Sequence, residues 1–209
     1  MIIQCDFDGT IIRNNLSVLL REQYACGDWQ KIDSDYLHGH ITVEQSNKLQ
    51  FVLIKEPKER LQAFVRQYIE LRPGFVEFIR YCQESTIPFA IVSNGLDFYI
   101  EPVLAEIGMP DLELHCGRTS FSRGGIDVAY YDPVGNIVSE GFKKKYLLWL
   151  KERGTNIIYL GNGLSDLEAA RQADYVFATG HLLDLLDIHS IEHSAFSDFY
   201  DLLRQVRLL

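Results

Sequence analysis

The chain has 209 residues, a length that fits one domain or a core with one insertion and excludes a large repeat array. Its composition, 47% hydrophobic and 23% charged residues, is typical of a globular protein and argues against disorder. With 20 Lys and Arg against 29 Asp and Glu, the net charge of -9 repels a phosphate backbone, so we expect no nucleic-acid partner.

No apolar run approaches the roughly 20 residues that span a bilayer, and the N-terminal MIIQC has no basic stretch before an apolar one. We therefore expect a soluble, cytoplasmic protein without a membrane partner. The cysteines form no CxxC pair, which favours reduced thiols over a disulfide or a metal site. Cys5 and Cys82 lie in apolar surroundings typical of small buried thiols.

Short apolar runs that end in polar or glycine residues predict buried strands over residues 1–5, 88–92, 156–160 and, more weakly, 175–178. Helical patterns separate them, and the first is opened by Pro73 and Gly74. The helical faces comprise Phe75, Phe78, Ile79 and Cys82; then Tyr146, Leu147, Leu150 and Lys151; residues 164–173; and Phe196, Phe199, Leu203 and Val206. This alternation predicts an α/β fold with a parallel sheet.

Residues 14–72 interrupt the alternation with helical segments near 16–24, 43–54 and 58–68 and no strand. We expect a core of residues 1–13 and 73–209 and an inserted helical cap of residues 14–72. The insertion lies between the first two strands, so it can cover their carboxyl ends, where open α/β sheets bind ligands. Residues 118–139, with Gly124-Gly125 and Gly135-Asn136, predict a hairpin excursion.

The strongest motif is Asp6-Phe7-Asp8-Gly9-Thr10, directly after the first strand. Two carboxylates one residue apart at a strand end point in different directions, so one can face a substrate while the other reaches back to it. The alternative is an Asx-turn in which Asp8-Gly9 only turns the chain.

The next two strands also end in groups suited to an anion or a cation. Ser93, Asn94 and Gly95 offer a hydroxyl and backbone N–H groups before a helix, although an ordinary N-cap is the alternative. Asn162 and Asp166 lie in Gly161-Asn162-Gly163-Leu164-Ser165-Asp166, whose alternative is a glycine turn followed by a helix-stabilising Asp.

A lysine run, residues 143–145, precedes the last of these motifs. Such a run is usually a solvated helix face, but Lys143 shares its face with Leu147 and Leu150. Lys145, followed at the same spacings by Trp149 and Glu152, has a weaker claim to point inward. An inward lysine needs an anionic partner, which a phosphate with clustered carboxylates would supply.

These four motifs, DFDGT, SNG, an isolated lysine and GNGLSD, resemble in this order the motifs of the haloacid dehalogenase superfamily of phosphohydrolases. The resemblance runs from Ile2 to about Ala170, and the insertion resembles the helical cap of the phosphoserine phosphatase-like class. It implies a Rossmann-like parallel sheet core with an inserted helical cap. Within the superfamily, residues 87–104 and 115–121 are most similar to methionine-salvage phosphatases.

The resemblance also implies a role for each motif residue. Asp6 would be the nucleophile that forms an aspartyl-phosphate, and Asp8 the general acid and base. Phosphate would be held by Ser93, Asn94, Gly95 and Lys143, and Mg²⁺ by Asp6, Asp8, Asn162 and Asp166. Asn162 departs from the Asp that superfamily members usually carry, so we expect weaker Mg²⁺ binding, with Asp166 keeping the second acidic position.

The sequence therefore predicts a Mg²⁺-dependent phosphomonoesterase of a small phosphorylated metabolite, with the methionine-salvage enol phosphate as one candidate and a monomer or homodimer as the assembly. Alternatives are a phosphoserine phosphatase or phosphomutase on the same fold, or a catalytically silent phosphate-binding protein, which only Asn162 supports. Asp8 argues against a dehalogenase, because halide displacement needs no acid there.

Other polar and aromatic residues are interpreted as structural. A metal site is not expected at His38, His40 and Glu44, where a polar loop is favoured. No nucleophile motif accompanies His181, His189 or His193, and core or cap packing is favoured for Tyr24, Trp29 and Phe98, the last of which should face the cleft.

Overall fold

The computed structural model describes residues 1–153 and 156–209. Its centre is an eight-stranded sheet in the order β5-β4-β3-β2-β1-β6-β7-β8. The neighbouring strands β3, β2, β1, β6, β7 and β8 pair in parallel. At one edge, β4 pairs antiparallel with β3, and β5 pairs antiparallel with β4. The strands are β1 (Ile2–Cys5), β2 (Phe89–Leu96), β3 (Glu113–Ser122), β4 (Gly125–Tyr131), β5 (Ile137–Val138), β6 (Ile157–Gly161), β7 (Tyr175–Ala178) and β8 (Ser194–Ala195).

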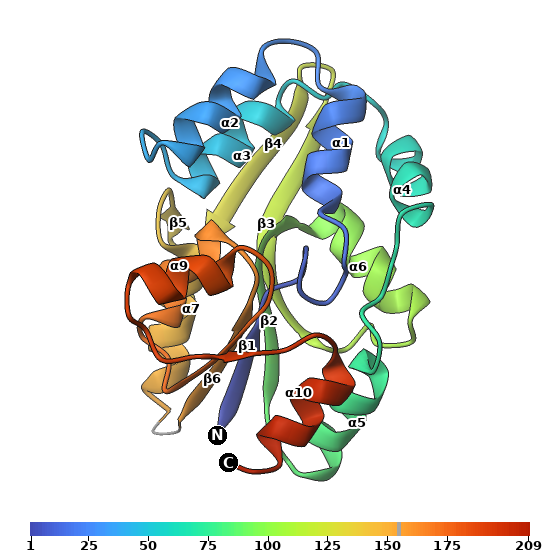
Figure 1. Ribbon diagram of the computed structural model, residues 1–209. Coiled ribbons are helices and arrows are strands. Elements are labelled where there is room, and N and C mark those ends of the chain that lie inside the picture. The colour runs from blue at the N-terminus through green and yellow to red at the C-terminus, as the bar shows by residue number, and fades with distance from the viewer. Residues whose placement is uncertain (154–155) are drawn as a thin grey trace.

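Helices flank both sides of this sheet, with α5 and α10 on one side and α7 and α9 on the other (Figure 1). The predicted Rossmann-like α/β fold is confirmed. The helices are α1 (Leu16–Tyr24), α2 (Trp29–Leu37), α3 (Val43–Phe51), α4 (Lys58–Arg66), α5 (Phe75–Glu84), α6 (Asp97–Glu106), α7 (Phe142–Lys151), the 3₁₀ turn η1 (Leu164–Asp166), α8 (Leu167–Ala170), α9 (Leu182–Ile188) and α10 (Phe199–Val206).

The predicted strands agree with β1, β2, β6 and β7, except that β2 is longer, whereas the first part of β3, which pairs parallel with β2 from Glu113, was not predicted. Strand β2 continues from Phe89 through the Ser93-Asn94-Gly95 motif to Leu96, and every residue in it is buried. Its pairing with β3 shifts register between Val92 and Leu96. The motif therefore forms an irregular strand end and does not follow the strand as a separate loop.

The predicted helix faces are mostly confirmed, with differences at helix ends. The face of α5 buries the four predicted residues, whereas residues 164–173 begin as the 3₁₀ turn η1 and end after the short helix α8. Phe196 precedes α10, and Leu202 is fully buried there instead of Leu203. Helix α9 and the short strand β8 were not predicted.

The insertion contains α1, α3 and α4 where helices were predicted, and also α2, which was missed. Helix α2 has no fully buried residue, although Trp29, Ile32, Tyr36 and Leu37 recur at helical spacing. The predicted hairpin is formed by β3 and β4, which pair from Ser122 and Gly125 outward. The hairpin extends upward beside α3 (Figure 1).

The structure bears on two sequence expectations, one about membrane-spanning segments and one about the cysteines. No helix among them is long and apolar enough to cross a membrane. All four cysteines are free thiols, and Cys5 and Cys82 are buried as predicted; Cys116 is buried too, and Cys26 is exposed.

An aromatic cluster joins α5 to α10, the two helices that pack together near the chain ends. The Phe199 ring lies 5.0 Å from that of Phe75 and 5.5 Å from that of Phe78, measured between centroids. Replacing Phe199 by Ala should therefore lower the free energy of unfolding by about 3–5 kcal/mol. Urea denaturation would measure it, with Leu208→Ala, at a side chain 86% exposed, as the control expected to change little. Equal losses for both variants would contradict the packing described here.

Candidate active site

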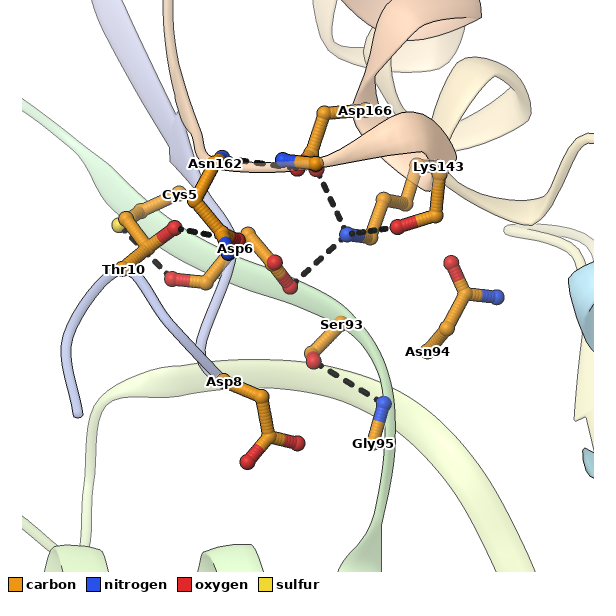
Figure 2. A network of polar contacts seen from close by, with 12 residues as sticks. Cys5, Asp6, Asp8, Thr10, Ser93, Asn94, Gly95, Lys143, Asn162 and Asp166 are labelled. Atoms are coloured by element: carbon orange, nitrogen blue, oxygen red, sulfur yellow. Dashed lines mark hydrogen bonds and ion pairs between the residues drawn. The ribbon is translucent and has the colours of Figure 1, made fainter. Parts of the chain in front are cut away.

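The site lies at the carboxyl edge of the three adjacent strands β2, β1 and β6. Figure 2 shows Asp6 and Asp166 joined through Lys143 at this edge, with Asn162 beside Asp6 and the Asp8 carboxylate pointing away from the lysine. They line a cavity of 280 Å³ whose other wall comes from α1, α2 and α3 of the insertion. Each predicted site residue except Asp166 lines this cavity. Asp166 is fully buried directly behind it and contacts Lys143.

The turn after β1 is fixed by one glycine and one arginine. Gly9 has a φ of +77°, and a Cβ there would clash with the Asn162 side-chain amide, so only glycine fits. Arg72, at the end of the insertion, donates from Nε to the Thr10 carbonyl at 2.7 Å and from a terminal nitrogen to the Gly9 carbonyl at 2.7 Å. Sequence analysis missed Arg72, because no local pattern marks a side chain that binds backbone 60 residues away.

Lys143 joins two carboxylates from different parts of the chain. Its Nζ lies 2.8 Å from Asp6 Oδ1 and 2.7 Å from Asp166 Oδ1, and it donates to Ser165 Oγ at 3.2 Å. The lysine is 3% exposed, so its predicted inward orientation is confirmed, whereas Lys145 is exposed. The ammonium thus has three oxygen partners that compensate for its burial.

Asp166 organises the turn between β6 and α8. Besides Lys143, it accepts hydrogen bonds from the Tyr159 hydroxyl at 2.7 Å and from the backbone N–H groups of Asn162 and Gly163, each at 2.9 Å. Asp166 is therefore an anchor for the lysine and the turn.

Burial and ion pairing set the charges at this centre. Burial raises the pKa of the Asp6 carboxyl to about 7, although the neighbouring Lys143 opposes that shift. Burial by itself lowers the pKa of Lys143, but the Asp166 and Asp6 carboxylates outweigh it and raise the pKa above its usual value. The lysine is therefore permanently charged, and further positive charge beside Asp6 would favour its carboxylate form.

Asp8 faces the insertion. Its Oδ1 accepts from the Leu16 N–H at the start of α1 at 2.9 Å, and its Oδ2 accepts from the Tyr99 hydroxyl at 2.6 Å. Burial raises the pKa of Asp8 to about 6, against the lowering effect of these two hydrogen bonds. This carboxyl can therefore exist in both protonation states near neutral pH, as a proton-transfer group requires.

The Ser93-Asn94-Gly95 segment, at the irregular end of β2, is hydrogen-bonded to the insertion. Ser93 Oγ accepts from the Gly95 N–H at 3.0 Å, and the Asn94 carbonyl accepts from Asn47 Nδ2 at 2.8 Å. Neither Ser93 nor Asn94 caps α6, whose N-cap position is Leu96 without a side-chain hydrogen bond. The N-cap alternative for this motif is therefore wrong.

Oxygen atoms converge on the Asn162 carboxamide. With its nitrogen facing inward, the amide donates to Asp8 O at 2.9 Å, to Asp6 Oδ2 at 3.1 Å and to Thr10 Oγ1 at 3.2 Å. Rotation of the amide would present its own oxygen to the same point. Among the described residues no three His, Cys, Asp or Glu side chains gather as a metal cluster, so the donor set is one carboxylate, one carbonyl and one amide. These oxygen donors fit Mg²⁺, which usually keeps several waters and binds through one or two carboxylates.

The insertion contributes polar residues that sequence analysis did not single out. Buried polar side chains on α1 and α3 face the cavity: Ser17, Arg21, Ser46, Asn47 and Gln50. The signal in the sequence is helical spacing of polar residues on a buried face, as for Ser17 and Arg21, four positions apart beside Leu16 and Leu20. Such residues need partners, which a polar ligand can supply.

Four residues set aside in the sequence can also be located. His181 lines the cavity after all. Phe98 is 1% exposed and packs edge-on against Tyr99 and Phe121, so the expectation that it faces the cleft is wrong. His38 stacks on His40 at the exposed end of α2, as expected for a polar loop.

A parallel sheet with two carboxylates after its first strand and a buried lysine at the same edge defines an α/β enzyme whose site lies at the carboxyl ends of its strands. The model of the haloacid dehalogenase-like hydrolase family matches residues 3–171. The chain belongs to this family.

The relatives agree with this assignment. The 2-hydroxy-3-keto-5-methylthiopentenyl-1-phosphate phosphatases of Bacillus pumilus and Brevibacillus brevis are each 30% identical to the chain over 208 residues, which is 98% of its length and 90% and 94% of theirs. A phosphoserine phosphatase with a phospho-aspartyl intermediate analogue superposes with a TM-score of 0.71 at 20% identity, over 100% of this chain and 98% of that one. The predicted superfamily and the prediction of a phosphatase are confirmed.

The two lysines of α7 test the site geometry. Lys143→Ala should lower kcat/KM for p-nitrophenyl phosphate by about 10- to 100-fold, because one charge-assisted hydrogen bond is lost. Lys145→Ala should change it little, since that side chain is exposed. Steady-state kinetics of both variants, with circular dichroism to verify folding, would measure the difference. Equal effects would show that Lys143 is not the cation of this site.

Proposed function

We propose that the protein is a Mg²⁺-dependent phosphomonoesterase that hydrolyses a small phosphorylated metabolite through an aspartyl-phosphate on Asp6. The observation that carries this proposal is the placement of Asp6 and Asp8 in one cavity with the buried Lys143, whose Nζ lies 2.8 Å from Asp6 Oδ1. A carboxylate nucleophile, a second carboxyl for proton transfer and a fixed cation are the groups that this reaction needs.

In the first step a carboxylate oxygen of Asp6 attacks phosphorus, and the bond from phosphorus to the ester oxygen breaks. Asp8 in its protonated form gives its proton to the departing oxygen, so the leaving group departs as an alcohol or enol. Tyr99 and the Leu16 N–H hold the Asp8 carboxyl in a fixed orientation. The products of this step are phospho-Asp6 and the Asp8 carboxylate.

In the second step Asp8 accepts a proton from a water molecule, whose oxygen attacks the phosphorus of phospho-Asp6. The bond from phosphorus to the Asp6 oxygen breaks, which releases inorganic phosphate and restores both carboxyl groups. The Asp8 pKa of about 6 supports its use as an acid and then as a base.

The phosphoryl oxygens would be held by Ser93, the backbone N–H groups of the Asn94-Gly95 turn and Lys143. Asp6, the Asp8 carbonyl and Asn162 would hold Mg²⁺, with Asp166 anchoring the Asn162 backbone. When bound, the ion would neutralise phosphoryl charge and favour the ionised form of Asp6.

We also propose that residues 14–72 are a cap over a core of residues 1–13 and 73–209. Support comes from the cavity, which takes one wall from the strand ends and the other from α1, α2 and α3. An enclosed site excludes bulk water and selects substrates by shape. A small phosphorylated metabolite fits such a volume better than a polymer.

For the physiological substrate we propose the methionine-salvage enol phosphate, because the names of relatives that match nearly the whole chain specify it. The phosphoserine phosphatases share the fold at 20% identity, which supports no particular substrate. The alternatives that an experiment must distinguish from this function are a phosphomutase and a catalytically silent binding protein.

A substrate panel tests this function. We expect the wild-type enzyme with Mg²⁺ to release phosphate from the methionine-salvage intermediate with a higher kcat/KM than from phosphoserine. Asp6→Asn should abolish release and leave the fold intact, because an amide cannot act as the nucleophile. Phosphate release would be measured by a colorimetric assay, with circular dichroism as the folding control. Normal turnover by Asp6→Asn, or no turnover of any phosphate by the wild type, would contradict the proposal.

Asn162 provides a test of the metal site. Asn162→Asp adds a negative charge to the donor set and should lower the Mg²⁺ concentration for half-maximal activity, whereas Asn162→Ala should raise it. Mg²⁺ titrations of activity and of thermal stability would measure both shifts at fixed pH. If neither variant changes the Mg²⁺ dependence, Asn162 is not a ligand.

A further inference from the structure

Two residues that line the cavity each have a buried polar atom without a hydrogen-bond partner among the described residues, and both belong to the insertion. Arg21 on α1 is 6% exposed and its Nε has no hydrogen-bond partner. Gln50 on α3 is 0% exposed and its Oε1 likewise has none. Both residues line the 280 Å³ cavity. A buried donor and a buried acceptor left unpaired each cost about 1–3 kcal/mol, so a ligand that satisfies them gains affinity.

The other contacts of these two side chains leave Arg21 Nε and Gln50 Oε1 unpaired. Among the residues that the structure describes, the nearest charge to the Arg21 guanidinium is Asp33 Oδ1, 3.6 Å from a terminal nitrogen and therefore beyond hydrogen-bond length. Gln50 Nε2 donates to the Trp29 carbonyl at 3.2 Å and approaches the same Asp33 oxygen at 3.4 Å. Arg21 and Gln50 thus approach the same carboxylate, so these two cavity-lining side chains lie close together.

This region lies on the side of the cavity toward which Asp8 faces. The Asp8 carboxyl binds the first N–H of α1, and Tyr99 links it to the Ser17 hydroxyl at 2.8 Å. Arg21 follows Ser17 by one helical turn on the same buried face. Asp8 would protonate the leaving oxygen, and the first N–H of α1 binds Asp8. Arg21, further along α1, therefore lies where the leaving group would be and not where the phosphate would be.

The geometry points to Arg21 and Gln50 as the residues that select the leaving group, by binding a carbonyl oxygen and a neighbouring hydroxyl of a phosphorylated hydroxycarbonyl compound. Arg21 Nε would donate to the carbonyl, and Gln50 Oε1 would accept from the hydroxyl. Asp33 already balances the arginine charge, and a carboxylate would offer no proton to Gln50, so a neutral hydroxycarbonyl fits better than an acid. This inference rests on the proposed function.

Three small phosphates separate these chemistries: dihydroxyacetone phosphate has the carbonyl and hydroxyl, propyl phosphate has neither, and phosphoglycolate has a carboxylate. We expect the wild type to prefer dihydroxyacetone phosphate to propyl phosphate in kcat/KM. Arg21→Lys, which keeps the charge but removes Nε, should lower kcat/KM for dihydroxyacetone phosphate by about 10- to 100-fold. Gln50→Met, similar in volume, should act in the same direction.

Propyl phosphate is the internal control, since its turnover by both variants should stay near wild type and thereby exclude misfolding. Arg66→Gln, at an exposed arginine of α4, is the matched control and should leave all three substrates unchanged. Equal losses for dihydroxyacetone phosphate and propyl phosphate, or a larger loss for phosphoglycolate than for dihydroxyacetone phosphate, would overturn the assignment.

Binding separates a failure of this inference from a failure of the proposed function. Calorimetry would compare dihydroxyacetone phosphate and propyl phosphate with the Asp6→Asn protein and with the Asp6→Asn, Arg21→Lys double variant. Weaker binding of dihydroxyacetone phosphate alone in the double variant supports the role of Arg21, whether or not the wild type turns over either compound. Unchanged binding of both overturns it.

Discussion

The buried contact of Lys143 with Asp6 and Asp166 is the interaction on which the site depends. The three residues come from the end of β1, the start of α7 and the turn after β6, and each is no more than 5% exposed. Charges buried this deeply are tolerated only when they are paired, so removal of Lys143 would leave two buried carboxylates without their shared cation. Since Asp166 also binds two N–H groups of the 162–163 turn, the same contact positions Asn162 beside Asp6 and Asp8.

A second constraint is that the insertion is bound to the loops that carry the chemistry. Glu44 of α3 accepts from the Phe142 N–H at 2.9 Å, Asn47 donates to the Asn94 carbonyl, and the first N–H of α1 binds Asp8. Burial raises the pKa of Asp8, whereas the hydrogen bond from the Leu16 N–H of α1 lowers it. The insertion therefore contributes to the acid strength of the proton-transfer group that we propose.

Much of the fold and of the site could be predicted from the sequence, because the strong signals are local. Apolar runs ending in polar motifs mark the parallel strands and their carboxyl edge, and the spacing of Lys143 to Leu147 and Leu150 indicates its inward orientation. Arg21, Gln50 and Arg72 were missed, because their partners lie on other elements and a polar residue on a helix is normally solvated. Helix α2 was missed although the sequence carries a signal for it, since Trp29, Ile32 and Tyr36 recur at helical spacing.

The central claim is that Asp6 carries the phosphoryl group between the two steps. The most direct measurement is rapid acid quenching of the wild-type enzyme during turnover of a substrate labelled in its phosphate, followed by peptide mapping. The account predicts label on the peptide that contains Asp6, and no labelled peptide with the Asp6→Asn variant. Label on a different residue, or turnover without any labelled enzyme under conditions that preserve acyl phosphates, would contradict it.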